Sequence, residues 1–372
     1  SGEVKNSAGN CVAACTDPKA NNYGEPGRCT YTAIPKPVLI PVLVIPVTGS
    51  QNQIASGLGH TCAVTERTGL RCWGENDFGQ LGNGTYKNSS VPVNVKNVNP
   101  KAVISLAAGS KHSCALLSSG EVMCWGLNES GQLGDGTNTN RNIPVKVVGL
   151  KGNIVSITAG FQYTCAMNDK NETMCWGAND MGQLANGTSA NANVPVLSNL
   201  SGIKLISGAY HELQAITSSG GLAFYSNSPA IPVTGMTSDV ALVSGNRFDD
   251  GGCVLDFSGN VKCWGSILGS GISDALLTNL LSTGQSHACV QTSKGLVCWG
   301  TNTHGQLGNG TSDNSESPVA VKDIQNVIAL AAGSNHTCAI VDPETIKCWG
   351  SNEFGQLGNG TFEDSLVPVL VK

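Results

Sequence analysis

The sequence predicts an all-β protein, a seven-bladed β-propeller built from a repeated unit of about fifty residues. The tripeptide Cys-Trp-Gly occurs six times and contains every tryptophan of the chain. The 47 glycines and the low content of charged residues, 13%, are typical of short strands joined by tight turns rather than of helices. The six tripeptides begin at Cys72, Cys124, Cys175, Cys263, Cys298 and Cys348.

The most regular unit covers residues 103–147 and has the pattern of four short strands. An apolar strand at residues 104–108 leads into a Gly-x-x-His turn that ends at His112. The second and third strands carry Cys114 and Cys124 and are joined by a Ser-Ser-Gly turn. A Gly-Gln-Leu-Gly loop then leads to a last strand with the pattern Pro-Val-x-Val. Four short strands per unit are the content of a propeller blade.

Seven such units follow one another, although the fourth and fifth lack the Gly-Gln-Leu-Gly loop and are shorter. The chain ends on a strand at residues 367–372 that matches the last strand of each unit, and the first unit begins directly at Ile54. We therefore expect the N- and C-terminal strands to share a blade and close the ring, because closure removes exposed strand edges. The second-strand positions of the units are Cys62, Cys114, Cys165, Leu213, Cys253, Cys289 and Cys338.

Twelve of the 15 cysteines form pairs nine or ten residues apart, one pair per unit. Cys114 and Cys124 lie symmetrically about Ser119, so they should face each other across an antiparallel hairpin and form a disulfide. Zinc sites instead use short Cys-x2–4-Cys knuckles assembled in fours. In the fourth unit Leu213 and Ala223 are taken as the joint replacement of both cysteines. The expected bridges are Cys62–Cys72, Cys114–Cys124, Cys165–Cys175, Cys253–Cys263, Cys289–Cys298 and Cys338–Cys348, which favour an oxidising compartment.

The N-terminal part of the chain divides into a cysteine-containing segment at residues 1–33 and a linker or edge strand, rich in proline and valine, at residues 34–50. Cys15 and Cys29 bracket a turn-rich stretch and are the preferred additional bridge. Cys11 is then free or paired with another chain, and a different local connectivity is equally open. Residues 51–372 form the propeller, and Ser1 is interpreted as a start from which a leader has been removed.

Charge and hydropathy exclude two classes of partner. The net charge of −5 and the lack of clustered Lys and Arg argue against nucleic-acid binding. No apolar run reaches the length of about 18 residues that direct membrane insertion requires.

The sequence contains no catalytic or metal-binding constellation, so we predict a non-enzyme without cofactor or metal. Histidines recur at one position of the Gly-x-x-His turn, which favours a structural role over a catalytic one. The adjacent Asp249 and Asp250 fall short of a calcium coordination set. The Asn-Gly-Thr matches to the glycosylation motif lie in turns of the repeat and are interpreted first as turn chemistry. The recurring histidines are His60, His112, His211, His287 and His336.

Three recurring motifs, Gly-x-x-His-x-Cys-Ala, Cys-Trp-Gly-x-Asn and Gly-Gln-Leu-Gly-x-Gly-Thr, resemble the repeat of the regulator of chromosome condensation family over residues 51–372. The resemblance implies a seven-bladed β-propeller. Its functional implication is broad, because the family includes nucleotide-exchange factors, a plant ultraviolet-B photoreceptor and a secreted bacterial β-lactamase inhibitor. The hairpin cysteines suggest an exported, bacterial-type member located outside the cell or in the periplasm. Light sensing is disfavoured because no tryptophan follows the glycine of the Gly-x-x-His turns.

In this family the two positions between Gly and His lie on the face where partners dock. Aromatic and charged residues concentrate at these turns in units three to five, and such residue types dominate binding hot spots. The alternative is that the degenerate units have merely diverged. The predicted partner-binding residues are Phe161, Gln162, Tyr163, Tyr210, Glu212, Arg247, Phe248, Asp249, Asp250 and Lys111.

These observations predict a secreted or cell-surface, non-catalytic binding module that recognises a protein or cell-surface ligand, with a glycan as one form of that ligand. The N-terminal segment would join an anchor or a partner chain. The alternative is a secreted inhibitor of an extracellular enzyme such as a β-lactamase. Guanine-nucleotide exchange is a third candidate by analogy, but it conflicts with the disulfides.

Overall fold

The computed structural model describes residues 3–5, 11–13, 52–225, 231–232, 238–246, 251–265, 267, 272, 275–276 and 280–372. The chain divides into two compact units, Ser1–Thr48 and Gly49–Lys372. In the first unit, β1 (Glu3–Lys5) and β2 (Cys11–Ala13) form a two-stranded antiparallel sheet. The predicted Cys15–Cys29 bridge and the linker at residues 34–50 lie outside the described residues. The described part contains no helix long and apolar enough to cross a membrane.

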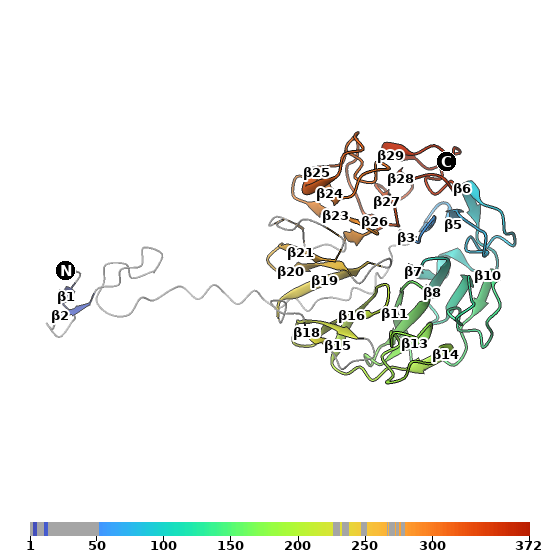
Figure 1. The fold of residues 1–372 in the computed structure, drawn as a ribbon, viewed down its shortest axis with the longest axis horizontal. Coiled ribbons are helices and arrows are strands. Elements are labelled where there is room, and N and C mark those ends of the chain that lie inside the picture. Colours follow the sequence, from blue (N-terminus) through green and yellow to red (C-terminus); the bar gives the residue numbers. More distant parts are fainter. Residues whose placement is uncertain are drawn as a thin grey trace. The chain divides into compact units, whose positions relative to one another are not determined.

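The second unit is a ring of seven antiparallel sheets, which we number as blades 1 to 7 (Figure 1). Blade 1 is β3 (Gln53–Ser56), β4 (His60–Thr65), β5 (Gly69–Gly74) and β6 (Ser89–Asn94). After the 3-10 helix η1 (Pro100–Ala102), blade 2 is β7 (Val103–Ala108), β8 (His112–Leu117), β9 (Val122–Gly126) and β10 (Arg141–Lys146). Blade 3 is β11 (Ile154–Ala159), β12 (Tyr163–Asn168), β13 (Thr173–Gly177) and β14 (Ala192–Leu197).

The remaining blades are less uniform. Blade 4 is β15 (Ile203–Gly208), β16 (Leu213–Thr217), β17 (Leu222–Tyr225) and the two-residue β18 (Ile231–Pro232). The described part of blade 5 holds three strands, β19 (Val240–Gly245), β20 (Gly252–Asp256) and β21 (Val261–Trp264). Blade 6 is β22 (Leu281–Thr283), β23 (His287–Thr292), β24 (Gly295–Gly300) and β25 (Ser315–Ala320). Blade 7 is β26 (Ala329–Ala332), β27 (His336–Ile340), β28 (Ile346–Gly350) and β29 (Ser365–Leu370).

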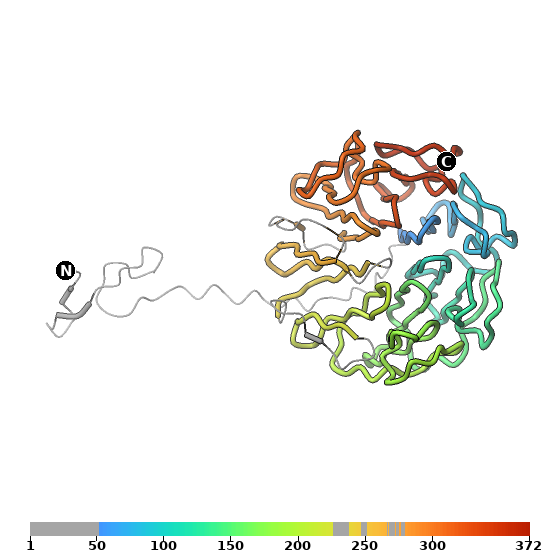
Figure 2. The backbone as a smooth tube through the Cα atoms, viewed as in Figure 1, coloured from blue at the N-terminus to red at the C-terminus, as the bar shows by residue number. Residues whose placement is uncertain are grey.

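The ring closes between the first and last blades, but not through a shared blade as the sequence predicted. Strand β29 pairs with β28 in its own sheet, and β3 to β6 form a complete blade by themselves. The innermost strand of blade 7, β26, instead contacts the innermost strand of blade 1, β3. Figure 2 shows the last blade, in red, beside the first, in blue. The seam is therefore an ordinary interface between two complete blades.

The hairpin disulfides are confirmed in six blades. Each cysteine of the second strand lies directly opposite its partner on the third strand, with Cα atoms 4.0–4.1 Å apart. Such short separations are typical of a non-hydrogen-bonded pair in an antiparallel ladder. Eleven of the twelve cysteines are buried, and Cys263 of blade 5 is the partly exposed one. The disulfides thus lie inside the stack of blades.

The register of blade 4 corrects the predicted replacement of its cysteines. Leu213 pairs with Tyr225 and Ala223 pairs with Ala215, so neither occupies a cysteine position. The equivalents of Cys114 and Cys124 are Gln214 and Phe224, which lie opposite each other. Each predicted position lies one residue too early in the sequence. The prediction counts from Gly208, the glycine that ends β15, whereas the register of the hairpin is set by the turn that ends at Gly220.

Neighbouring blades are joined by a repeated set of hydrogen bonds. The Nε1 of Trp125 in blade 2 donates to the backbone oxygen of Gln80 in the blade 1 loop, at 2.8 Å. The Ser113 hydroxyl donates to the same oxygen and lies 2.9 Å from the Nε2 of His60. The same tryptophan bond is made by Trp73, Trp176 and Trp349. These four tryptophans pack between blades and are all fully buried.

The two tryptophans that follow the degenerate blades lack this bond. Blades 4 and 5 have no Gly-Gln-Leu-Gly loop, and within the described residues the Nε1 atoms of Trp264 and Trp299 find no acceptor. Hydroxyl groups on the innermost strands make links at the four joints from blade 3 to blade 7, which include the two joints without the tryptophan bond. Thr158 and Ser207 each accept a hydrogen bond from a backbone N–H of the next blade, at 2.8 and 2.9 Å. Ser244 and Ser282 do the same at 3.1 and 2.9 Å.

The outer strand of each regular blade carries a proline near its centre. Proline cannot donate a ladder hydrogen bond, so it prevents pairing with another chain at an exposed edge. The pairing of the outer strand with the third strand also shifts register next to this proline. The prolines are Pro92, Pro144, Pro195, Pro318 and Pro368.

Candidate functional site

The candidate site lies on the face of the ring that carries the Gly-x-x-His turns, which we call the turn face. The Gly-Gln-Leu-Gly loops reach the same face. Lys111 of a turn lies 4.9 Å from the ring centre of Phe78 in the loop of the preceding blade. Ser130 of the next loop donates to Gln162 of the next turn, at 3.3 Å. Each loop therefore borders the turn of the following blade.

Backbone hydrogen bonds hold successive turns in fixed positions. The N–H of Leu58 donates to the oxygen of Ser110 at 3.0 Å, and the N–H of Ser110 donates to the oxygen of Phe161 at 3.1 Å. On the other side of the ring, Gln285 donates to Ser334 at 3.1 Å, and the side chain of Asn246 donates to Gln285 at 2.6 Å. Turns of neighbouring blades are thus tied together by hydrogen bonds at four joints of the ring.

Four of the five predicted turn histidines have the structural role that the repetition indicated. His60, His112, His287 and His336 are fully buried, and the Nε2 of each lies 2.8–2.9 Å from a Ser or Thr hydroxyl of the next blade. In three cases that hydroxyl donates its proton to a Gln backbone oxygen, so the imidazole must be the donor at Nε2. These side chains are committed to the joints between blades.

Burial keeps two of these imidazoles neutral. Desolvation lowers the pKa of His287 from 6.5 to about 4. The pKa of His336 falls to about 3, because desolvation acts together with the nearby His287. A catalytic base needs access to a substrate proton, and fully buried imidazoles do not have it.

His211 is different from the other four. The blade 4 register places Glu212, not His211, at the position equivalent to His112. The His211 ring is half-buried and lies against Tyr210, with ring centroids 3.7 Å apart. His211 is therefore a residue of the turn face.

Tyr163 must be removed from the predicted partner-binding residues. It occupies the histidine position of blade 3 and is 0% exposed. Its hydroxyl donates to the backbone oxygen of Glu212 at 2.6 Å and accepts from the N–H of Ala209 at 3.1 Å. The next blade has Leu213 where blades 1, 2, 3 and 7 have Ser or Thr, so a histidine would find no hydroxyl there. The longer tyrosine reaches the backbone instead.

We expect Tyr163→Phe to lower the free energy of unfolding by about 0.5–1.5 kcal/mol, because it removes the hydrogen bonds of the hydroxyl, while the Ala209 N–H and the Glu212 oxygen keep their own bond at 3.2 Å. Urea denaturation checks the value. The double variant Tyr163→His/Leu213→Thr, which introduces the His–Ser/Thr pair found at four other joints, should recover part of the loss. A Tyr163→Phe variant as stable as the original protein would contradict the assigned role.

Phe161 and Tyr210 form an aromatic pair across the joint between blades 3 and 4. Their ring centroids are 4.6 Å apart with an interplanar angle of 69°, an edge-to-face contact. Gln162 lies beside Phe161 in the same turn, and His211 continues the row next to Tyr210. All four side chains are half-buried. Aromatic groups from two blades are thus offered together at one joint.

Met181 extends this group. Met181 occupies the loop position that Phe78 holds in blade 1 and Ser130 in blade 2. Phe78 contacts Lys111 and Ser130 contacts Gln162, each in the turn of the following blade. The residue at this turn position in blade 4 is His211. Its side chain is 46% exposed. Methionine adapts to varied partners, and it is common on binding surfaces. We call Phe161, Gln162, Met181, Tyr210 and His211 the blade 3–4 surface.

The remaining predicted residues do not all join this surface. Lys111 lies at the joint of blades 1 and 2, where its Nζ is 2.8 Å from the Oε1 of the buried Glu75. Glu212 is half-buried, and its side chain accepts from Gln214 at 3.4 Å. Arg247, Phe248, Asp249 and Asp250 lie outside the described residues. Sequence reasoning missed Met181 and Glu75, although their recurring loop positions could have indicated both.

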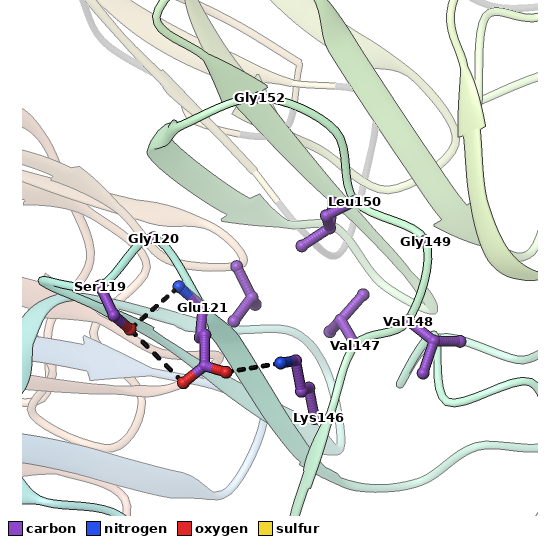
Figure 3. A pocket seen from close by; sticks show the side chains of 10 residues that line it. Ser119, Gly120, Glu121, Lys146, Val147, Val148, Gly149, Leu150 and Gly152 are labelled. Carbon is purple, nitrogen blue, oxygen red and sulfur yellow. Dashed lines mark hydrogen bonds and ion pairs between the residues drawn. The ribbon is translucent and has the colours of Figure 1, made fainter.

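A shallow pocket of about 370 Å³ lies elsewhere on blade 2 (Figure 3). One wall carries the Glu121–Lys146 ion pair, and Val147, Val148 and Leu150 line the rest. Its polar wall is largely exposed to solvent, and there the Ser119 hydroxyl donates to Glu121 at 3.4 Å. Within the described residues no group of three or more His, Cys, Asp or Glu side chains could hold a metal ion.

The fold and the repeated contacts between blades show a β-propeller built from one repeated unit, with a disulfide inside six of its blades. Two models of the regulator of chromosome condensation (RCC1) repeat match the chain, one at residues 52–80, 103–132, 154–183 and 327–356, the other at 72–116, 119–167, 295–340 and 348–372. The chain therefore belongs to the RCC1 repeat family. The matched ranges leave out residues 184–294, which contain blades 4 and 5 together with β14 of blade 3 and the first two strands of blade 6.

Known proteins with this repeat are similar over most of the propeller. The E3 ubiquitin-protein ligase HERC2 of Homo sapiens is 30% identical over 296 residues, 77% of this chain and 6% of HERC2. The ultraviolet-B receptor UVR8 of Arabidopsis thaliana is 28% identical over 303 residues, 79% of this chain and 63% of UVR8. The chain thus spans less than two thirds of the length of either relative.

Solved structures share the fold at low sequence identity. The ectodomain of the receptor kinase CR4 from Physcomitrella patens has a TM-score of 0.52 at 16% identity, with 81% of this chain and 72% of that chain covered. Prp20p from Saccharomyces cerevisiae has a TM-score of 0.50 at 22% identity, with 86% and 76% covered.

Proposed function

We propose that the propeller is a non-catalytic recognition module that binds a protein partner through the blade 3–4 surface. The observation that carries this proposal is the edge-to-face pair of Phe161 and Tyr210, half-exposed on a rigid frame and extended by Met181. Aromatic residues dominate binding hot spots, and a partly exposed aromatic pair held in place loses little conformational entropy when it is covered.

The family supports a protein as the partner. Prp20p binds Gsp1p and histones, and the CR4 structure is the ectodomain of a receptor kinase. The sequence relatives HERC2 and UVR8 are a ubiquitin ligase and a light receptor, so the repeat serves proteins of different activities. The shared element is a propeller, which supports a binding role for this chain rather than one fixed activity.

The proposed location is the cell exterior or its surface. Six disulfides in one propeller favour an oxidising compartment, because thiols are kept reduced in the cytosol. An exported bacterial-type protein fits this compartment, and the cysteine-containing segment at residues 1–33 would join the propeller to an anchor or a partner chain.

The double variant Phe161→Ala/Tyr210→Ala tests the surface. We expect it to lose partner binding at least about a hundredfold, since two hot-spot aromatics cost about 2 kcal/mol or more each. The matched control is Tyr86→Ala/Phe362→Ala, which removes two rim aromatics that are 51% and 57% exposed in blades 1 and 7. Immobilised propellers are compared by quantitative mass spectrometry of the extracellular proteins that each retains.

The outcomes separate the candidate functions. A protein retained by the control and lost from the double variant is the expected result. A glycan array and a β-lactamase hydrolysis assay run with the same variants identify a glycan ligand or an inhibitor role. Equal retention by both variants contradicts the blade 3–4 surface, and equal unfolding midpoints show that both variants are folded.

A further inference from the structure

Five loops of the ring contain the same tight turn, and four of them place asparagine directly before glycine. In each turn the Asn or Asp Oδ1 accepts hydrogen bonds from the N–H and the hydroxyl of the following threonine. Asn-Gly is the dipeptide most open to deamidation, because glycine has no side chain to hinder attack by its own backbone nitrogen. The turns are Asn83-Gly84, Asp135-Gly136, Asn186-Gly187, Asn309-Gly310 and Asn359-Gly360.

Deamidation begins at the glycine nitrogen. This nitrogen gives up its proton and attacks the side-chain Cγ of asparagine, a C–N bond forms, and ammonia leaves with the proton. The resulting succinimide takes up one water molecule, which opens the ring at either carbonyl to give aspartate or isoaspartate. No oxidant or other reactant is needed. A hydrogen bond from the glycine N–H slows the reaction, because the nitrogen must lose that bond before it attacks.

The glycine nitrogens differ in this bond. The N–H of Gly84, Gly310 and Gly360 each donates to a backbone oxygen at the outer edge of the next blade, at 2.7–2.9 Å. Gly136 does the same at 2.9 Å. The N–H of Gly187 finds no acceptor within the described residues, and Gly187 is exposed. The blade that follows it is blade 4, whose outer strand β18 is only two residues long.

The backbone beside Asn186 is also strained. Ala185 has a φ of 50°, whereas glycine holds this position in the other four loops with φ between 63° and 67°. A side chain in this left-handed region costs about 1 kcal/mol or more. Relief of that strain lowers the cost of opening the turn around Asn186, which the attack requires.

We propose that Asn186 is a site of selective deamidation in the folded protein. Blade 2 shows that an aspartate fits the turn, since Asp135 keeps the same contacts to Thr137. Asp135 is paired with Arg141 at 2.8 Å, but the equivalent residue of blade 3 is Ala192. An aspartate at position 186 would therefore add an unpaired negative charge to the loop that also carries Met181.

The chain contains its own matched control, because Asn186 and Asn309 both lie in the sequence Asn-Gly-Thr-Ser. The folded protein is incubated at mildly alkaline pH, and peptide mapping by mass spectrometry measures both deamidation rates. We expect Asn186 to react about fivefold to tenfold faster, the factor that one hydrogen bond of about 1 kcal/mol provides. In the reduced, denatured chain the two rates should be equal. Equal rates in the folded protein, or a faster Asn309, would overturn the proposal.

Lys322 provides a second test. A side chain on Gly310 would lie 2.5 Å from the Nζ of Lys322, whereas Gly187 is next to Asn199. The variant Lys322→Asn makes the two surroundings alike and leaves the Gly310 hydrogen bond in place. Asn309 should stay slow in this variant. A rise of its rate to that of Asn186 would assign the protection to the lysine and contradict the role of the glycine hydrogen bond.

Discussion

Replacing Trp125 by alanine is expected to lower the free energy of unfolding by about 3–5 kcal/mol, the usual cost of removing a fully buried large aromatic side chain. Trp125 is 0% exposed and packs with Leu81 and Val95 of the preceding blade. The change also removes the hydrogen bond that the Gln80 oxygen accepts at 2.8 Å. It opens a cavity at the joint between blades 1 and 2, lined by the side chains that pack on the indole.

Trp264→Ala is the matched control. Trp264 follows a cysteine in the same tripeptide, but it is partly exposed and its Nε1 has no partner within the described residues. Its ring centroid lies 5.4 Å from that of Phe224, so some packing is lost there too. Urea unfolding with the disulfides intact gives both values. A loss for Trp264→Ala as large as that for Trp125→Ala would contradict the role assigned to the loop and tryptophan contact.

The repeat unit and its disulfides could be read from the sequence because they depend on local spacing. Cys114 and Cys124 flank one turn, and the antiparallel register follows directly from their symmetry about Ser119. Closure of the ring could not be predicted in this way. The last strand has the same pattern whether it completes its own blade or another, so only long-range pairing decides that β29 joins β28.

Blade 4 shows how a single misplaced reference residue affects the interpretation of a site. Counting from Gly208 places His211 at the structural position, whereas the strand pairing places Glu212 there. The turn pattern predicts Tyr163 as a surface residue, although its position after Gly160 is that of the buried histidines. The replacement of a hydroxyl residue by Leu213 in the next blade was the signal that Tyr163 serves the joint.

The aromatic surface was predicted only in part. The sequence predicts Phe161 and Tyr210 as separate turn residues, and their direct contact depends on the spacing of blades 3 and 4, which no local pattern encodes. The links near the ring centre were missed for a similar reason. Thr158 and Ser207 occupy an inner-strand position that holds Ala107 in a regular blade, and their value becomes visible only once the neighbouring N–H is placed beside them.

Acidification from pH 6.5 to about 4 is expected to destabilise the propeller through its buried histidines. The folded pKa of His287, about 4, and that of His336, about 3, lie below the unfolded value of 6.5. Between these values the unfolded chain binds protons that the folded chain excludes, so stability falls as the pH falls. The stabilising contribution is complete above pH 6.5. For His287 alone the loss reaches roughly 3 kcal/mol when the pH has fallen to its folded pKa of about 4.

The double variant His287→Gln/His336→Gln isolates this effect from the titration of carboxylates. It should be less stable at neutral pH, because two joints between blades lose their imidazoles, yet its free energy of unfolding should fall less steeply between pH 6.5 and 4. His304→Gln serves as the control, since His304 lies on the surface with its Nδ1 2.8 Å from Asp364. Urea midpoints measured across this range give the slopes. Equal slopes for the double variant and the original protein would show that the buried imidazoles do not govern acid stability, and the propeller would then owe its acid response to its carboxylates.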